Sequence, residues 1–390
     1  MLNTTGVLAK FTKPLSKERI LVLNRMKIAI LLPDLRGGGA ERLHVNLANH
    51  WITQGHSVEF VLMQKYGELL PLLSDDINVI ELGIDRIRQA IFPLRIYLKK
   101  SKPDIILSAM WPLTSATVIA WLLSGKQGHL FLSDHNQLTV SCIQELNVSA
   151  FFLKFLLHVT YPFASGIIAV SQGVKEDLRQ LGRFSDDQVK VIYNPAATGA
   201  TACCEQQVSR GAFWGQGFKY HILSVGSLKK QKDHATLIRA FARLPSKLKA
   251  KLTILGEGPL RKELETLIDH LKLKEQVIMP GFVTDPKPWF STADLFVLSS
   301  QWEGFGNVLV EALECGIPIV STDCASGPSE ILENGRYGRL VLVGNEIALA
   351  TAMGEALIEE PDRELLKSRA NEFSVERISA QYLKFFKEAM

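Results

Sequence analysis

A glycine-rich string that carries two glutamates is the most chemically suggestive part of this sequence. The string 299–307 is Ser-Ser-Gln-Trp-Glu-Gly-Phe-Gly-Asn, and Glu311 follows it inside the predicted helix 308–314. Gly304 and Gly306 allow the backbone to bend around a ligand. The amides that open the helix would then bind a diphosphate, and Glu311 could accept hydrogen bonds from diol hydroxyls such as those of a ribose. Surface carboxylates on an ordinary helix are the alternative.

A second glycine-rich turn, Gly37-Gly38-Gly39, joins the predicted strand 27–32 to the predicted helix 40–53. Free amides at such a helix start attract an anion. The turn is not the dinucleotide fingerprint, because Arg42 stands where the third glycine is required, and the chain contains no P-loop string. An anion site and a simple strand-to-helix turn therefore both remain open here.

Length and composition describe an ordinary globular chain. The 390 residues are 47% hydrophobic and 22% charged, and at roughly 100–200 residues per domain they predict two domains. Disorder, collagen and coiled coil are excluded as the main architecture. The formal net charge of +4 belongs to residues 1–25, while residues 26–390 are neutral. A neutral body without an aromatic–basic repeat argues against a nucleic-acid partner.

Residues 1–25 are predicted to be a basic extension, either a flexible tail or a segment ahead of a native start at Met26. The segment lacks the apolar run of a secretory signal. Five scattered cysteines without a C-x-x-C pair predict neither a disulfide framework nor a zinc site. This cysteine usage favours a reducing cytosol.

Short β-rich runs alternate with helical patterns along the rest of the chain, as in parallel sheets covered by helices on both faces. The sequence predicts a first α/β unit over 26–195, a linker over 196–219, a second unit over 220–373 and a final helix over 374–390. The predicted strands are 27–32, 58–63, 105–107, 130–132, 167–170, 189–192, 220–225, 251–255, 277–279, 295–298, 317–320 and 339–342. Because the motifs follow strands, we expect a ligand in a cleft between the two units.

From Met26 onward the chain resembles the retaining glycosyltransferases of family four. Besides the two strings above, the resemblance is carried by Asn194-Pro195, Val225–Leu228 with Lys232, Gly256–Pro259 and Pro280–Phe282. It implies the GT-B fold, an α/β architecture of two Rossmann-like domains facing a central cleft. The first unit would be the acceptor domain and the second the nucleotide-sugar domain, with the C-terminal helix crossing back to the first. The family uses a nucleotide-sugar donor and neither a catalytic metal nor another cofactor.

The resemblance also implies roles for single residues. Glu311 would hold the donor ribose, Glu303 would contact the donor sugar, and Lys232 would neutralise the departing phosphates. His135, after the strand 130–132, would lie near the donor sugar, with a structural loop histidine as the alternative. The remaining predicted donor-binding residues are Gly38, Gly39, Ser227, Gly256, Gly258, Gly281, Phe282, Gly304, Phe305, Gly306 and Asn307.

Ser227 departs from the family pattern, which often has an arginine at this position. That arginine shares the neutralisation of the diphosphate with the lysine. Lys229 or Lys230 could substitute for it, or Lys232 could act alone. For Lys229 and Lys230, solvated loop charges are the alternative.

A basic and apolar segment, 86–102, contains no acidic residue. A helix of this kind could lie on an anionic bilayer, and a surface helix packed on its own sheet is the alternative. The residues predicted to face a membrane or acceptor are Arg86, Arg88, Arg95, Lys99 and Lys100. Segment 149–170 is too interrupted to span a membrane, and we expect a core helix there, or a helix followed by a strand.

Segments 226–234 and 324–331 resemble a bacterial subgroup that builds O-antigen, capsule or related glycans on a polyprenyl-diphosphate carrier. The subgroup often uses UDP-N-acetylhexosamine or UDP-hexose. This implies a lipid-linked glycan acceptor and a cytoplasmic protein held peripherally at the inner membrane. Two other classes stay open: a nucleotide-sugar epimerase of the same fold, and a non-enzymatic module that binds anionic lipid.

Overall fold

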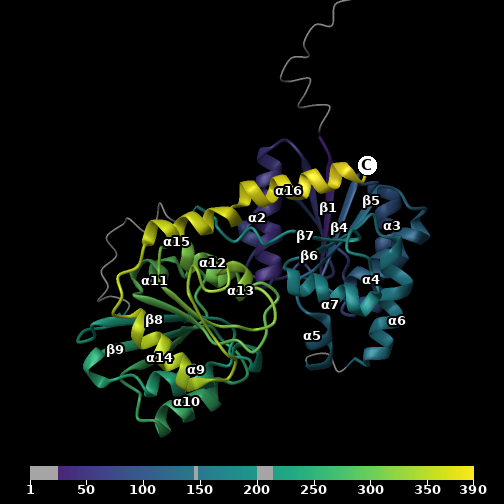
Figure 1. Cartoon of the computed structure of the whole chain (residues 1–390). Coiled ribbons are helices and arrows are strands. Elements are labelled where there is room, and N and C mark those ends of the chain that lie inside the picture. Colours follow the sequence, from purple (N-terminus) through teal and green to yellow (C-terminus); the bar gives the residue numbers. More distant parts are fainter. Residues whose placement is uncertain (1–24, 145–147, 200–213) are drawn as a thin grey trace, which may run out of the picture.

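The computed structural model describes residues 25–144, 148–199 and 214–390. The predicted basic extension, apart from Arg25, and the central part of the predicted linker lie outside the described residues. Two parallel sheets, each covered by helices, form two lobes joined near residues 192–199 and 371–375 (Figure 1). The expectation of an α/β fold with two Rossmann-like domains is therefore confirmed.

The first sheet has seven parallel strands in the order β3-β2-β1-β4-β5-β6-β7. Its strands are β1 Lys27–Leu32, β2 Ser57–Leu62, β3 Asn78–Glu81, β4 Ile105–Ala109, β5 His129–Asp134, β6 Gly166–Ala169 and β7 Val189–Val191. The central strands are continuous apolar runs because helices cover both faces of the sheet. Our sequence prediction missed β3, a four-residue edge strand with exposed ends and only two apolar residues.

Alternate residues of β1 enter two different cores, as the period of two along a strand requires. Ile28 and Ile30 pack under α2, whereas Ala29 and Leu31 pack under the helices of the opposite face. The helices of this domain are α2 Gly39–Thr53, α3 Ile91–Ser101, α4 Leu113–Ser124, α5 Leu138–Gln144, α6 Ala150–Thr160 and α7 Gln172–Gly182. A 3₁₀ turn, Ile87–Gln89, precedes α3, so the basic and apolar segment 86–102 is not one continuous helix but is divided near Ala90.

The second sheet has six parallel strands in the order β10-β9-β8-β11-β12-β13. Its strands are β8 Tyr220–Val225, β9 Ala250–Leu255, β10 Val277–Gly281, β11 Leu295–Leu298, β12 Ile319–Thr322 and β13 Arg339–Val341. Its helices are α9 His234–Ala242, α10 Arg261–His270, α11 Lys287–Thr292, α12 Asn307–Glu314, α13 Pro328–Ile331, α14 Glu346–Ala356 and α15 Arg363–Ala370. The strand order reverses beside β8, as it does beside β1, and such switch points are where doubly wound sheets bind ligands.

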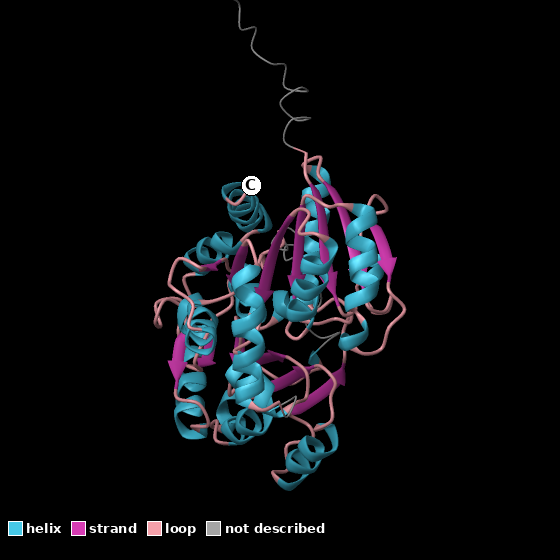
Figure 2. Ribbon diagram, turned by 90° about the vertical axis from the view of Figure 1, so that its right-hand side faces the viewer, coloured by secondary structure: helices cyan, strands magenta, loops and turns pink. Residues whose placement is uncertain are grey.

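The last helix, α16 Val375–Glu388, crosses back to the first domain and lies against α2 (Figures 1 and 2). Trp51 of α2 donates a hydrogen bond from Nε1 to Ser379 Oγ at 2.9 Å, and its ring packs edge-on against Tyr382 and Phe386. The two chain segments that connect the domains, 192–199 and 371–375, are also hydrogen-bonded to each other, because Ala197 donates its N–H to the carbonyl of Phe373. The predicted crossing of the C-terminal helix is confirmed.

Within the described residues, no helix has both the length and the apolar character needed to cross a membrane.

The docking of α16 predicts a large stability effect at Phe386. This ring is fully buried against Trp51, Phe131 and Tyr382. Phe386→Ala should lower the free energy of unfolding by about 3–5 kcal/mol in chemical denaturation, because it leaves a cavity between the helix and the first domain. Lys384→Ala, on the exposed side of α16, is the matched control and should cost less than about 0.5 kcal/mol. Equal effects of the two changes would contradict the docking.

Candidate functional site

The two domains meet through polar contacts at the carboxyl ends of their strands. Asn307, at the start of α12, donates from Nδ2 to the carbonyl of Gly39 at 3.2 Å. Its Oδ1 accepts a hydrogen bond from Asn194 Nδ2 at 2.7 Å. Glu330 accepts the N–H groups of Gln172 and Gly173 at the N-terminus of α7, where the helix dipole favours a carboxylate. The cleft between the domains is therefore bridged at several points.

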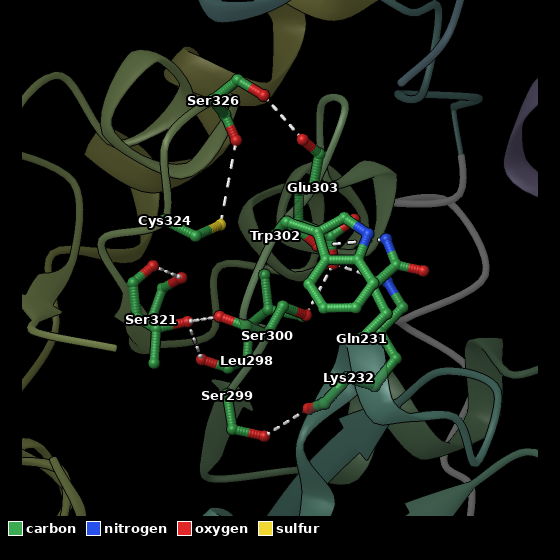
Figure 3. A network of polar contacts seen from close by, with 11 residues as sticks. Gln231, Lys232, Leu298, Ser299, Ser300, Trp302, Glu303, Ser321, Cys324 and Ser326 are labelled. Atoms are coloured by element: carbon green, nitrogen blue, oxygen red, sulfur yellow. Dashed lines mark hydrogen bonds and ion pairs between the residues drawn. The ribbon is translucent and has the colours of Figure 1, made fainter. Parts of the chain in front are cut away.

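An ion pair between Lys232 and Glu303 lies in the second domain, at the end of β11 (Figure 3). Lys232 Nζ is 2.5 Å from Glu303 Oε1, and Ser300 Oγ donates to the same oxygen at 2.6 Å. The two charged side chains are only 16% and 7% exposed. Burial has removed most of the water from both charges. Separating the pair would leave each charge buried without compensation, so the ion pair keeps its geometry.

The backbone around this pair is held by side chains from neighbouring loops (Figure 3). Ser326 Oγ donates to the carbonyl of Glu303 at 2.6 Å, and Gln231 Nε2 donates to the carbonyl of Trp302 at 3.0 Å. Ser299 Oγ donates to the carbonyl of Lys232 at 2.8 Å. These bonds join the loops after β8, β11 and β12, so the position of the ion pair depends on three strands.

At Gly304 and at Gly256 another backbone segment passes too close for a side chain. A Cβ on Gly304 would lie 1.8 Å from the carbonyl oxygen of His135, which belongs to the other domain. A Cβ on Gly256 would lie 2.1 Å from the carbonyl oxygen of Gly226, and Gly256 has a φ of 144°. The first contact brings His135 next to the loop that carries Glu303, and the second presses the loops after β8 and β9 together.

Two histidines, the buried His44 and the half-buried His135, form the first domain's side of the site. The ring of His135 lies edge-on to that of His44 on α2, with 5.2 Å between centroids. His44 Nδ1 lies 2.7 Å from the carbonyl of Ala40, and His135 Nε2 lies 3.0 Å from Ser133 Oγ. His44 Nε2 and His135 Nδ1 have no partner among the described residues. Burial lowers the pKa of His44 to about 4 and lowers that of His135 well below its usual value, so both imidazoles are neutral at pH 7.

Glu311 faces a cavity between the domains rather than open solvent. Arg42 of α2, Lys287 of α11 and Pro195 also line this cavity. Burial raises the pKa of Glu311 to about 7, and the charges of Arg42 and Lys287 oppose the rise. An uncharged carboxyl and its anion are thus close in free energy near neutral pH.

The structure places the other predicted donor-binding residues in different surroundings. Gly38 is the N-cap of α2 and Gly39 is its first residue, and Phe282 is half exposed, with its ring 3.4 Å from a Cβ built on Gly37. The remaining loop positions are backbone sites: Ser227 follows β8, Gly258 lies against the carbonyl of Leu228, Gly281 ends β10, and Gly306 caps α12 with a φ of 104°.

Phe305 is expected to contribute its backbone to donor binding, and its side chain has a different role. The side chain of Phe305 is buried and packs against Tyr193 and Phe373, so it cannot contact a ligand in the cleft. Only its backbone lies in the loop between Glu303 and α12. The apolar ring instead joins α12 to the two chain crossings between the domains.

The basic residues predicted to face a membrane or acceptor lie outside the cleft, on and before α3 at the flank of the first domain (Figure 1). Arg95 donates from Nε to the carbonyl of Leu123 at the end of α4, at 3.0 Å. Arg86, Arg88, Lys99 and Lys100 are exposed. They form a surface separate from the ion pair and the histidines.

Our sequence analysis missed several residues of the site, namely Ser300, Ser326, Gln231, His44 and Arg42. Each lies within a string that the motifs already covered or next to one. Nothing in their spacing could show which neighbour each side chain meets, since the contacts join separate loops. Among the described residues, no group of three or more His, Cys, Asp or Glu side chains is arranged to hold a metal.

Two Rossmann-like domains with a shared cleft and a returning C-terminal helix define the GT-B class. Two family models match the chain: "Glycosyltransferase Family 4" over residues 37–199 and "Glycosyl transferases group 1" over residues 216–373. The chain belongs to glycosyltransferase family 4, with each domain matched by its own model.

Two Campylobacter jejuni proteins are similar in sequence. One is N-acetylgalactosamine-N,N'-diacetylbacillosaminyl-diphospho-undecaprenol 4-alpha-N-acetylgalactosaminyltransferase, 36% identical over 61% of this chain and 64% of that relative. The other, GalNAc-alpha-(1->4)-GalNAc-alpha-(1->3)-diNAcBac-PP-undecaprenol alpha-1,4-N-acetyl-D-galactosaminyltransferase, is 27% identical over 93% of this chain and 99% of its own length. The chain thus spans just under two thirds of the first relative and nearly all of the second.

Among solved structures, Anabaena Alr3699/HepE in complex with UDP and glucose has a TM-score of 0.77. It is 22% identical, and the match covers 93% of this chain and all of that one. Sucrose-phosphate synthase from Thermosynechococcus elongatus has a TM-score of 0.75 at 19% identity, over 93% of this chain and 99% of that one. At these identities the likeness establishes the fold.

The raised pKa of Glu311 predicts a pH-dependent stability. An unfolded glutamate ionises near pH 4.5, whereas the folded carboxyl stays protonated up to about pH 7. Its contribution to stability is therefore complete below pH 4.5 and is lost as the pH rises through 7. A glutamine does not ionise, so the variant loses no stability as the pH rises. Glu311→Gln should therefore raise Tm relative to the parent at pH 8 but not at pH 4. At about 2–4 °C per kcal/mol, the difference should reach several degrees. The exposed Glu360→Gln is the control, and a difference that does not change with pH would refute the burial of this carboxyl.

The contact of Gly304 with His135 predicts that a single methyl group opens the cleft. Gly304→Ala should leave each domain folded, since the atoms nearest to the new Cβ are backbone atoms of His135 and Asn136 in the other domain. Small-angle scattering should then show a larger radius of gyration, and activity should fall by about 10²-fold because the reacting groups separate. Gly354→Ala on α14, whose Cβ would meet only a leucine methyl at 3.8 Å, is the control. An unchanged radius with full activity would contradict this role.

Proposed function

We propose that this chain is a retaining glycosyltransferase that moves a sugar from a nucleotide diphosphate donor to a lipid-linked glycan. The Lys232–Glu303 ion pair carries the proposal, because it places a cation and a carboxylate together beside the glycine-rich start of α12. A diphosphate at that helix start would meet backbone amides and the ammonium of Lys232. Glu303 would then be available to accept hydrogen bonds from hydroxyls of the donor sugar.

The proposed reaction depends on stabilising the leaving group. The bond between the anomeric carbon and the phosphate oxygen breaks through an oxocarbenium-like state, and negative charge grows on the diphosphate. Lys232 and the helix amides stabilise that charge as it develops, so the proposal requires no catalytic metal. Gly38 and Gly39 would approach the diphosphate from the other domain, and Glu311 would hold the ribose.

Lys229 is the best substitute for the arginine that Ser227 replaces. Burial is the largest influence on the pKa of Glu41, which is raised to about 7, and the charge of Lys229 is among those that oppose the rise. Lys229 of the second domain therefore influences Glu41, in the first turn of α2. In the proposal it supplies the second positive charge for the diphosphate.

Retention of configuration would follow from attack on the same face that the diphosphate leaves. The acceptor oxygen bonds to the anomeric carbon, and its proton passes to the departing phosphate oxygen, so no enzymic nucleophile is needed. His135, a neutral imidazole beside Gly304, would position the donor sugar without adding charge. The bridged cleft would limit attack by water.

The names of the two Campylobacter relatives support a polyprenyl-diphosphate-linked acceptor and an N-acetylhexosamine donor sugar. We propose a UDP-N-acetylhexosamine or UDP-hexose donor, and a place in O-antigen, capsule or related polysaccharide synthesis. Such an acceptor lies in the bilayer, so we also propose a cytoplasmic enzyme bound peripherally to the inner membrane. The exposed basic residues on and before α3 support that contact.

The proposal predicts that Lys232→Ala and Glu311→Ala each lower transfer by about 10²–10³-fold, as the loss of a charge-stabilising contact does in other enzymes. Both variants should stay folded. A thermal-shift panel of UDP-, GDP- and ADP-sugars identifies the donor, and radiolabelled transfer to lipid-linked glycans measures activity.

The exposed Lys247→Ala is the matched control and should keep the parent activity. Near-normal turnover by either site variant would overturn the assignment. Release of free sugar from the donor without any acceptor would favour an epimerase instead.

A further inference from the structure

Helix α6 exposes an aromatic side to solvent. Phe151, Phe152 and Phe155 are 82%, 52% and 55% exposed, and Val159 and the following Phe163 are 43% and 48% exposed. The opposite side of the helix is anchored, since its buried residues are Leu153, Leu157 and Thr160. The expectation of a core helix at 149–170 is therefore wrong for this outer side, while a helix followed by a strand is confirmed. We call the five exposed residues the aromatic face.

The aromatic face continues onto two neighbouring helices. Lys126, just after α4, places its Nζ 5.6 Å from the centre of the Phe163 ring. Leu123, at the end of α4, is 50% exposed and accepts a hydrogen bond from Arg95 of α3. Phe92 and Ile96 of α3 are exposed as well. The three helices lie along one side of the first domain in Figure 1, the side that faces the viewer in Figure 2.

Positive charge surrounds these apolar side chains. Residues 86–170 contain eight Lys and Arg residues and three Asp and Glu residues. Of the three acids, Asp134 is buried, Asp104 accepts the backbone N–H of Lys27, and Glu145 lies outside the described residues. Lys154 and His158 stand among the phenylalanines on α6 itself, and both are exposed. Single exposed apolar residues are common, but such a cluster with a basic rim marks a binding surface.

We propose that the aromatic face inserts into the headgroup region of an anionic lipid bilayer, with α6 lying in the membrane plane. Phenylalanine rings would enter the acyl boundary, while Lys126, Lys154 and Arg95 would meet lipid phosphates. A second copy of the chain fits less well, because a two-fold contact would bring the same cations of both copies together. The choice of a bilayer rests on the proposed lipid-linked acceptor. The insertion itself rests on the aromatic face and deepens the predicted contact through α3.

Cosedimentation of the full chain with vesicles tests the inference. The parent should bind vesicles that contain phosphatidylglycerol and bind pure phosphatidylcholine more weakly. Phe151→Ser with Phe155→Ser should lower the partition coefficient by about tenfold or more, because two large apolar side chains are lost from the bilayer. Lys126→Glu with Lys154→Glu should remove the preference for the anionic lipid. The matched control is Ile347→Ser with Ile358→Ser, which alters residues 62% and 68% exposed on the second domain and should bind like the parent.

The inference would be overturned if the parent chain bound neither vesicle type, or if the phenylalanine variant bound vesicles like the parent. So would light scattering that shows a parent dimer and a monomeric phenylalanine variant, since the face would then join two copies. Thermal shifts with UDP-sugars in the same samples test the proposed function separately. Vesicle binding without any response to nucleotide sugars would refute the transferase and support the lipid surface.

Discussion

The Lys232–Glu303 ion pair is the interaction around which the cleft is arranged. Each of these two charges has little access to water and is compensated by the other. The surrounding hydrogen bonds from Ser300, Ser326 and Gln231 hold the pair in one geometry. A buried pair of this kind contributes little net stability, since desolvation offsets most of the attraction. The ion pair instead fixes the position of the Lys232 ammonium at the place where an anionic ligand would bind.

The imidazoles and two of the carboxyls in the rest of the cleft carry little fixed charge. The two histidines are neutral, and burial raises the pKa values of Glu41 and Glu311 to about 7. Such groups can change ionisation when a ligand brings its own charge. The site therefore combines fixed cations, among them Lys232, Arg42 and Lys287, with side chains whose ionisation could adapt to the proposed donor.

The outside of the first domain has a different physical character. There the cations are exposed, and they surround phenylalanines instead of pairing with buried carboxylates. The formal charge of the whole chain conceals both arrangements, because residues 26–390 sum to zero while residues 86–170 are strongly basic. The proposed cleft for a soluble anion and the proposed surface for anionic lipid thus occupy separate parts of the molecule.

Local patterns were sufficient for much of the fold and of the site. Apolar runs located twelve of the thirteen described strands within two residues at each end, and the glycine strings located the loops beside Lys232 and Glu303. These features depend on neighbours in the chain: strand periodicity, glycine at a turn, and a helix start after it. Edge strand β3 was missed because two apolar residues between exposed polar ends leave almost no periodic pattern.

The contacts between distant segments could not be derived in this way. The pairing of His44 with His135, the burial of Phe305 between Tyr193 and Phe373, and the exposure of Phe151 on α6 each depend on which elements become neighbours. An aromatic residue has the same local pattern whether another helix covers it or solvent does. The amino-acid order thus specified the elements and the chemistry available at their ends, whereas packing in three dimensions set which side chains are buried, charged or open to a partner.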